Sequence, residues 1–361
     1  MKKLFALLAA VLILSAAAFS ADAAFSEAAK KAAARADLVF VWGSDVHYQP
    51  QDNHGVSRDM IEEFVSAAHE TGAAFAAVTG DLYHGHYDKA TSLGNLAELC
   101  TFFEGCRVPV MMTQGNHDDN RYYVYKTRNP DDTFDMGQVI NKEDIFRIVL
   151  KGREKDFVTD PANPYGGWYY KDFTKAKIRV IMLNCIDVPH IPDYPVNRFK
   201  YYGGFGSDQL NWLASKALKF SKKGWGVIVM THIDYASPEI GNWAMPVNCE
   251  IVEGLLEAFA KQEAGTFYSF EEGMEARVKY NFRHNRSNEY IGAFAGHKHK
   301  NLSDSVSGVP HILVANMFNA SAGGFDLVTI DRKKRLINTF RCRQGAADPG
   351  LDRVFAYRQP Q

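Results

Sequence analysis

Short apolar runs, each followed by polar side chains capable of chemistry, recur along this chain. Runs of about five apolar residues that end near a glycine predict buried β-strands. Five runs share this pattern, and their ranges with the polar residues that follow are 38–42 with Asp45 and His47, 74–78 with Asp81, 108–112 with Asn116, His117 and Asp118, 226–230 with His232, and 290–294 with His297 and His299.

Helical patterns lie between several of these strands. Apolar residues recur at one-face helical spacing over 60–68, and Gly72 is a suitable stop. A second such pattern covers 210–218. Strands that alternate with helices predict an α/β fold, in which ligands collect beyond the carboxyl ends of the strands. The polar clusters are therefore expected to meet at one edge.

The rest of the chain predicts hairpins and insertions. The runs 325–330 and 336–340 flank a charged turn, and 168–170 precedes the strand 177–185, so we expect two hairpins. Two stretches, 119–167 and 233–289, are too long to be simple loops. We interpret them as insertions that cover the site.

The N-terminus predicts export. Two lysines precede an apolar run from Leu4 to Phe19, and Ala21-Asp22-Ala23 offers small residues for cleavage after Ala23. The run is short for a membrane span, which needs about 20 apolar residues, although an uncleaved anchor is the alternative. We expect a signal peptide over 1–23, a linker or frayed helix over 24–36, one domain over 37–345 and a tail over 346–361, with the protein periplasmic or secreted and without a membrane span after signal removal.

Composition excludes little beyond this. The 361 residues are 46% hydrophobic and carry a formal net charge of −1, so no global bias toward nucleic acid or anionic membrane exists. The basic run 331–335 is interpreted as a solvated turn. Five cysteines lack the paired spacing of a zinc site. Cys100 and Cys106 are close enough to bridge, and free thiols are the equal alternative.

The polar clusters supply two aspartates, one asparagine amide and four imidazoles, with His117 in addition. Oxygen and imidazole ligands suit divalent transition metals. Two such ions about 3.5–4 Å apart can clamp a phosphate and activate water. The neutral amide and imidazoles leave much of the metal charge uncompensated, which suits an anionic substrate.

Together, the motifs Asp45-Val46-His47, Gly80-Asp81, Gly115-Asn116-His117-Asp118, Thr231-His232 and Gly296-His297-Lys298-His299 resemble the five motifs of calcineurin-like metallophosphoesterases. They stand in the family's order over 45–299. The resemblance implies an α/β fold with two mixed β-sheets in a sandwich flanked by helices.

The resemblance also implies a role for each motif residue. Asp45, His47 and His299 would hold one metal, Asn116, His232 and His297 the other, and Asp81 would bridge them. A bridging hydroxide would attack phosphorus in line, and His117 would protonate the leaving alkoxide. Asp118 would orient His117, or would serve as a surface or capping residue.

Two neighbours of the motifs are further candidates. Arg121 could reach a phosphate oxygen. His84 could touch substrate or a third ion, with a solvated loop position as the alternative. In purple acid phosphatases an iron-binding tyrosine stands three residues after the bridging aspartate, whereas here that position is His84 and Tyr83 comes one place early. An iron-tyrosinate centre is therefore not expected, and Mn, Fe, Zn and Ni all suit the ligand set.

We expect hydrolysis of a phosphorylated small molecule, with diesters slightly favoured. A phosphomonoesterase or nucleotidase is the first alternative, and a non-catalytic binding module with the same fold is the second. An exported nuclease gains no support from the near-neutral charge. A zinc amide hydrolase would need a His-Glu-x-x-His helix, which this sequence lacks.

Overall fold

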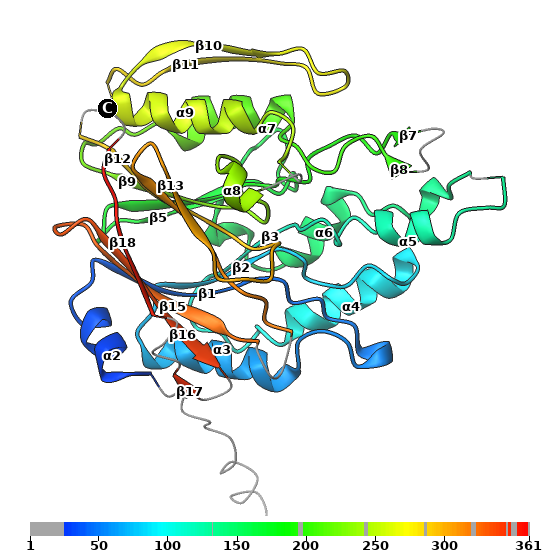
Figure 1. The fold of residues 1–361 in the computed structure, drawn as a ribbon, viewed down its shortest axis with the longest axis horizontal. Coiled ribbons are helices and arrows are strands. Elements are labelled where there is room, and N and C mark those ends of the chain that lie inside the picture. Colours follow the sequence, from blue (N-terminus) through cyan, green and yellow to red (C-terminus); the bar gives the residue numbers. More distant parts are fainter. Residues whose placement is uncertain are drawn as a thin grey trace, which may run out of the picture.

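The strands that precede the polar clusters divide between two mixed β-sheets that form the centre of the molecule (Figure 1). The computed structural model describes residues 25–131, 133–193, 198–241, 245–284, 287–318, 323–343, 346–347 and 352–359. The expected signal peptide lies outside these residues. Within them, no helix is both long and apolar enough to cross a membrane.

The first sheet has the order β17-β16-β15-β1-β2-β3, with β18 also paired to β16. Strands β1, β2 and β3 are parallel, whereas β15 is antiparallel to β1 and β16 is antiparallel to β15. The strands are β1 (Leu38–Gly43), β2 (Phe75–Thr79), β3 (Val110–Thr113), β15 (Phe325–Asp331), β16 (Leu336–Arg343), β17 (Ala346–Ala347) and β18 (Arg353–Ala356).

The second sheet has the order β13-β14-β12-β9-β6-β5-β4. Its central strands β6, β9, β12 and β14 are parallel. The strands are β4 (Val158–Thr159), β5 (Tyr169–Phe173), β6 (Ile178–Met182), β9 (Gly226–Met230), β12 (Glu289–Ala295), β13 (Ser303–Val306) and β14 (Val309–Leu313). Two small hairpins stand apart, β7 (Pro192–Asp193) with β8 (Arg198–Phe199) and β10 (Ala264–Ser269) with β11 (Ala276–Asn281).

Helices cover the outer faces of both sheets. The helices are α2 (Glu27–Ala33), α3 (Arg58–Glu70), α4 (Lys89–Thr101), α5 (Arg121–Lys126), α6 (Lys142–Val149), α7 (Ser207–Trp212), α8 (Pro238–Gly241) and α9 (Cys249–Lys261). Apolar residues of α3 and α4 join the core of the first sheet, and those of α7 and α9 join a separate core on the second. The predicted pattern at 210–218 begins as α7 and continues as a π-helical turn over Leu213–Ala217.

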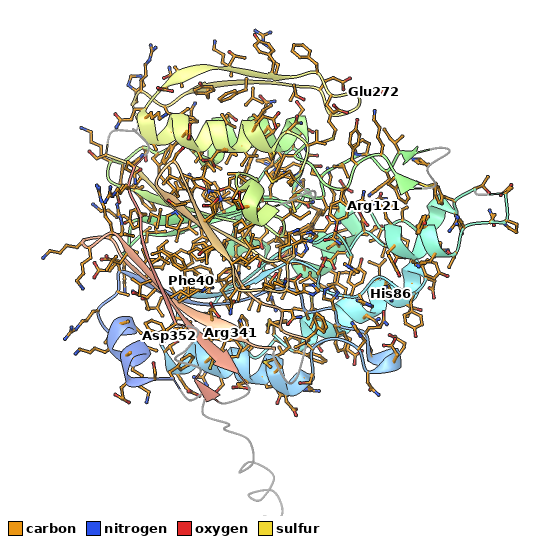
Figure 2. The ribbon with its side chains drawn as sticks, in the orientation of Figure 1. Phe40, His86, Arg121, Glu272, Arg341 and Asp352 are labelled. Atoms are coloured by element: carbon orange, nitrogen blue, oxygen red, sulfur yellow. The ribbon has the colours of Figure 1, made fainter. Side chains whose placement is uncertain are left out.

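Aromatic rings fill the space between the two sheets. Phe40 of β1 stacks on Phe75 of β2 with ring centroids 4.6 Å apart (Figure 2). Phe294 of β12 packs its ring edge-on against Phe40 at 5.5 Å and against Trp42 at 5.0 Å. All four rings are fully buried. This contact fixes the sheets relative to each other, and so also the loops that leave β1, β2 and β12.

Both predicted hairpins form, β15 with β16 and β5 with β6. The insertion at 119–167 contains α5 and α6, while that at 233–289 contains α8, α9 and the β10–β11 hairpin. Contrary to the prediction, α9 and this hairpin do not cover the site. They make an outer layer on the second sheet (Figure 1), because one face of α9 is apolar and packs against β12.

Both ends of the domain extend further than the sequence predicts. Helix α2 is capped by Ser26, whose Oγ accepts from the Ala29 amide at 3.1 Å, and Ala29 is fully buried. The segment expected to be a tail contributes β17 and β18 to the first sheet. The four residues of β18 pair with β16 along their whole length, so this segment belongs to the domain.

Arg353 of β18 fastens the end of the chain to both sheets. Its guanidinium donates to Asp326 at 3.0 Å in the first sheet and to the carbonyl of Leu313 at 3.0 Å in the second. Asp326 is fully buried and also accepts from Arg341 at 3.1 Å (Figure 2). A buried carboxylate needs such partners, because burying an unpaired charge is costly.

Arg353→Ala should lower the free energy of unfolding by about 2 kcal/mol, because it removes charged hydrogen bonds to buried acceptors. Urea unfolding followed by circular dichroism measures this change. Lys333→Ala, in the exposed turn between β15 and β16, is the control and should change stability by less than about 0.5 kcal/mol. Equal stability of the two variants would contradict the role given to Arg353.

Candidate metal centre

The loops that follow β1 and β2 continue to pair after the strands end. The amide of Asp45 donates to the Gly80 carbonyl at 3.0 Å, and that of His47 donates to the Asp81 carbonyl at 2.8 Å. These backbone bonds hold the first two polar clusters side by side at the carboxyl edge of the sheet.

Five residues of the predicted metal set have a left-handed backbone. Their φ angles are 54° at Asp45, 48° at His47, 49° at Asp81, 70° at His297 and 54° at His299. Each such residue costs about 1–3 kcal/mol and persists only where the surrounding structure enforces the conformation. Strain of this kind concentrates at functional sites, and here it turns the side chains of three different loops toward one point.

Two motif glycines are required by close approach of other motifs. A Cβ at Gly115 would collide with the backbone nitrogen and carboxylate of Asp81. A Cβ at Gly80, whose φ is +88°, would lie 2.7 Å from the ring of His232. The glycines before Asp81 and Asn116 therefore allow three ligand loops to pack against one another.

One group of donors gathers around Asp45. Its Oδ1 lies 3.2 Å from Nε2 of His299, and the same nitrogen lies 3.3 Å from Nε2 of His47. Single donor atoms of Asp45, His47, Asp81 and His299 all lie within 4.8 Å of one another. Carboxylate oxygens and imidazole nitrogens of this group face a common space.

A second group gathers around Asn116. Its Oδ1 lies 3.0 Å from Nε2 of His232 and 2.9 Å from Nδ1 of His297. Asp81 joins the two groups, because its Oδ2 lies 3.3 Å from Nε2 of His232 and 3.5 Å from Nε2 of His47. The structure thus brings together all seven residues predicted as ligands, with one carboxylate between two sets of three.

Hydrogen bonds outside the cluster set the orientation of its members. Nδ1 of His232 donates to the Thr79 carbonyl at 2.8 Å, which leaves Nε2 as the nitrogen that faces Asp81. The His297 amide donates to the Asp45 carboxylate at 3.0 Å. The donor set fits divalent ions, because imidazole nitrogens and carboxylate or amide oxygens, which are the ligand atoms such ions prefer, converge from several loops.

Comparisons with known proteins agree with this geometry. The sequence matches the family described as calcineurin-like phosphoesterase over residues 39–301. The chain belongs to the calcineurin-like phosphoesterase family. A dimetal phosphatase from Danio rerio has a similar fold, with a TM-score of 0.57 and 14% sequence identity over 90% of this chain and 100% of that one. A purple acid phosphatase from yellow lupin (Lupinus luteus) seeds aligns with a TM-score of 0.48 and 12% identity over 88% of this chain and 53% of that one. A comparison with curated proteins returned no match.

The pKa values in this family site reflect crowded charges. Burial lowers the pKa of His47 and of His297 to about 3. Burial would also lower the pKa of His232, but the carboxylates of Asp81 and Asp45 raise it to about 10. The same two carboxylates stabilise a proton on His232 and a bound metal ion, so proton and metal compete.

His117 and Asp118 do not form the pair that the motif suggested. Nδ1 of His117 donates to the His84 carbonyl at 2.8 Å, so that carbonyl orients the ring. The Asp118 carboxylate is fully buried and accepts from the amides of Leu82 at 2.8 Å and Gly115 at 2.7 Å. Asp118 thus ties the loop after β2 to the loop after β3, because these amides occupy its oxygens.

His84 lies beside His47 and His117, and single ring nitrogens of these three residues lie within 4.8 Å of one another, as a further ion would require. Nδ1 of His84 is 3.0 Å from Nδ1 of His47, and the rings of His54 and His86 lie at 4.0 Å and 3.7 Å from that of His84. The hydroxyl of Tyr83 donates to the Asp118 carbonyl.

Arg121 is held by the protein and not aimed at the metal cluster. Its guanidinium pairs with Asp119, donates to the Tyr201 carbonyl, and donates to the Tyr202 carbonyl at 2.8 Å. Arg121 therefore joins α5 to the segment after β8 (Figure 2). Tyr235, a further residue of the second insertion, is buried in the core with its hydroxyl 2.6 Å from that of Tyr290.

A cavity of about 480 Å³ adjoins Asn116 and His117. Its other walls are largely aromatic, and they come from α5 and from residues 199–202. Arg121 of α5 was a candidate from the sequence, whereas residues 199–202 were not, because they are distant from the motifs in the chain and carry no periodic or motif signal.

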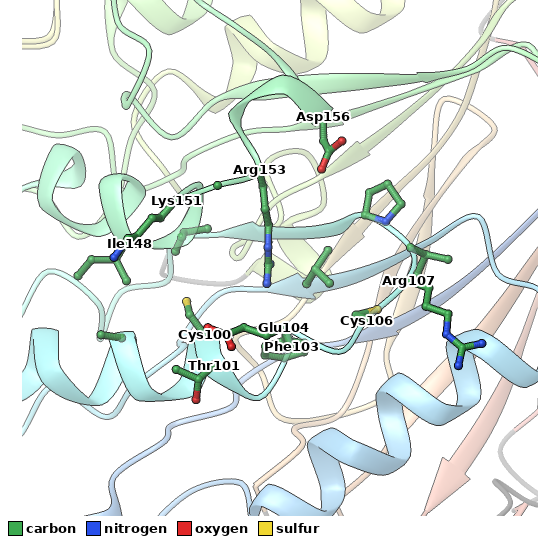
Figure 3. A pocket seen from close by; sticks show the side chains of 16 residues that line it. Cys100, Thr101, Phe103, Glu104, Cys106, Arg107, Ile148, Lys151, Arg153 and Asp156 are labelled. Atoms are coloured by element: carbon green, nitrogen blue, oxygen red, sulfur yellow. The ribbon is translucent and has the colours of Figure 1, made fainter.

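A larger cavity, of about 770 Å³, is lined by residues from the end of α4, the start of β3 and the segment after α6 (Figure 3), and no residue of the metal set is among them. Its lining includes Val110 at the start of β3, whereas Asn116 follows the end of that strand. The free thiols of Cys100 and Cys106 also line it. The bridge considered for these two cysteines is not formed, and the other three cysteines are free as well.

Metal binding to the metal-free protein should release protons at pH 8. The raised pKa of His232 keeps its ring protonated at that pH, and only a neutral imidazole binds a metal. Affinity should therefore fall as the pH is lowered. Calorimetric titration with Mn²⁺ in two buffers of different ionisation enthalpy measures the protons released.

His232→Ala should reduce this release by about one proton and weaken the binding of one ion. His69→Asn, at the end of α3, serves as the control with unchanged release. Equal proton release by the wild type and His232→Ala would contradict the assignment of His232 as a ligand.

Proposed function

We propose that this protein is an exported, metal-dependent phosphoester hydrolase with a dinuclear centre. The observation that carries the proposal is the position of Asp81, whose Oδ2 lies within 3.5 Å of imidazole nitrogens from both donor groups. The first group would comprise Asp45, His47 and His299, and the second Asn116, His232 and His297. When bound, two divalent ions such as Mn, Fe, Zn or Ni supply positive charge for phosphate oxygens and acidify a water molecule.

His117 is the group placed to donate a proton to the leaving oxygen. Its backbone amide donates to Asp81 Oδ1 at 2.9 Å, which anchors it beside the metal donors. Its ring centroid lies 4.7 Å from that of His47. Because Nδ1 is committed to the His84 carbonyl, Nε2 remains free to carry the transferred proton.

Phosphodiesters are slightly favoured over monoesters. A monoester carries one more negative charge than a diester, and a dianion profits from further cations beside the metals. Arg121 and Lys200, the two cationic residues that line the adjoining cavity, both have carboxylate partners, in Asp119 and Glu272. The described lining is thus better suited to an uncharged organic group.

Two alternative functions for this centre lead to different expectations. A phosphomonoesterase or nucleotidase would use the same centre with the opposite substrate preference. A non-catalytic binding module would have no need for a complete donor set, whereas here all seven donors converge. Retention of the full set therefore favours catalysis.

Mature protein loaded with Mn²⁺ should hydrolyse bis-p-nitrophenyl phosphate with a higher kcat/KM than p-nitrophenyl phosphate. Asp81→Asn should lower kcat by at least about 100-fold, because it removes the carboxylate shared by both donor groups. Asp59→Asn, on the exposed face of α3, is the matched control with wild-type kcat. Monoester preference would favour the first alternative, and no hydrolysis with both ions bound would favour the binding module.

His117→Asn should lower kcat about 100-fold or more for esters of alkyl alcohols, and much less for p-nitrophenyl esters. A poor leaving group needs the proton, whereas p-nitrophenolate leaves without it. Metal content by atomic emission should equal that of the wild type. Equal losses on both kinds of ester, or loss of metal, would count against the acid role.

A further inference from the structure

The cavity beside the metal donors has two aromatic walls. One wall is formed by Tyr122 and Tyr125 of α5, and the other by Phe199, Tyr201 and Tyr202. Asn116 and His117 form the end at the metal donors. We call these residues, with Arg121 and Lys200, the aromatic pocket. Its volume of about 480 Å³ is within the range of pockets that enclose small organic ligands.

Tyr122 is partly open to solvent. The residue is 40% exposed, although it lines the pocket beside the buried site. The ring stacks on that of His86 with centroids 4.4 Å apart and planes at 23°. It also lies 6.2 Å from the ring of His117, with planes at 30°. A flat surface therefore begins beside the proton donor and continues outward.

The opposite wall is held in place by polar contacts. Arg121 bonds the carbonyls of Tyr201 and Tyr202 and lies over the ring of Phe199 at 5.7 Å. The Tyr201 hydroxyl donates to the carbonyl of Glu272, at the tip of the β10–β11 hairpin. The second insertion, 233–289, thus helps to hold this wall in place through Glu272. Tyr202 reaches the metal donors, with its ring 5.7 Å from that of His297.

The charges of the pocket are already matched by protein partners. Arg121 pairs with Asp119, and Lys200 with Glu272 at 2.7 Å. Among the described lining residues there is no carboxylate. A second phosphate would find both lining cations committed to carboxylates, and a cationic group would find no anion in the lining. The ammonium of Lys126 lies over the Tyr122 ring, 5.3 Å from its centroid. An uncharged planar group would gain ring contacts without displacing any ion pair.

We propose that the aromatic pocket binds the alcohol side of the substrate, and that the enzyme prefers phosphoesters of alcohols that carry an uncharged planar ring, such as a benzyl or nucleoside group. This inference rests on the proposed function, because His117 must meet the leaving oxygen at the inner end of the pocket. Esters of small alcohols without a ring would leave the pocket filled with water. Ring stacking on one tyrosine is worth about tenfold or more in affinity.

The test compares benzyl, cyclohexylmethyl and ethyl esters, both as phosphate monoesters and as methyl diesters. All three are primary alcohols of similar acidity, so differences in kcat/KM report the pocket and not the leaving group. The benzyl ester should exceed the ethyl ester by about tenfold or more. It should also exceed the cyclohexylmethyl ester, which has similar size but no flat face.

Tyr122→Ala should lower the benzyl-to-ethyl ratio of kcat/KM by about tenfold. Tyr125→Ala provides a second variant that tests the same wall should the first fail to fold. Tyr268→Ala, which removes a 54% exposed tyrosine on β10 outside the pocket, is the matched control with an unchanged ratio. Inhibition constants of benzylphosphonate and ethylphosphonate give a binding measurement without bond cleavage, and they should follow the same order.

The outcomes separate the two proposals. If no ester is hydrolysed with metals bound, the proposed function fails, and the two phosphonates still test the pocket by calorimetric titration. If esters are hydrolysed but the benzyl-to-ethyl ratio is near one and unaffected by Tyr122→Ala, the inference is overturned. Equal rates for benzyl and cyclohexylmethyl esters would overturn the preference for a planar ring.

Discussion

The position of the Asp81 carboxylate is the constraint on which the rest of this structure depends. One of its oxygens accepts the His117 amide, and the other lies between imidazole nitrogens of two donor groups. Gly80 and Gly115 leave no room for larger side chains at their own positions, because a Cβ there would collide with His232 or with Asp81. Two aspartates are buried here with His47 and His232, and the charge of these carboxylates must be balanced by metal ions or protons.

The backbone around this carboxylate contributes as much as the side chains. Left-handed residues in the loops after β1, β2 and β12 aim their side chains inward, and inter-loop hydrogen bonds enforce those conformations. The loops are in turn fixed by the aromatic contact of Phe40 and Trp42 with Phe294. A rigid contact between sheets thus supports a strained arrangement of ligands, as catalytic positioning requires.

The sequence predicted most of the centre because its signals are local. Each ligand follows a short buried strand, and Asp81, Asn116 and His297 each follow or nearly follow a glycine, so both the fold class and the donor set were accessible. The hydrogen-bond partner of His117 could not be predicted from the sequence, because it is the backbone carbonyl of His84, and a carbonyl is present at every residue. Likewise, the sequence position of Arg121 suggested a phosphate contact. In the structure its guanidinium instead binds the Asp119 carboxylate and the carbonyls of residues 201 and 202. Strand β18 was missed because it is only four residues long and its sequence, Arg353-Val354-Phe355-Ala356, does not alternate between polar and apolar residues.

The topology of the first sheet has a consequence for the order of events during folding. β1 carries Asp45 and His47 on the loop after it, yet one of its two neighbours is β15, which lies nearly three hundred residues later in the chain. β15 pairs on its other side with β16, and β16 pairs with β17 and β18. A contact that spans this sequence separation forms slowly, because the intervening chain must first be brought together. The backbone support of the two earliest ligands, Asp45 and His47, therefore depends on strands formed by residues 325–343 and is complete only after that segment has been synthesised.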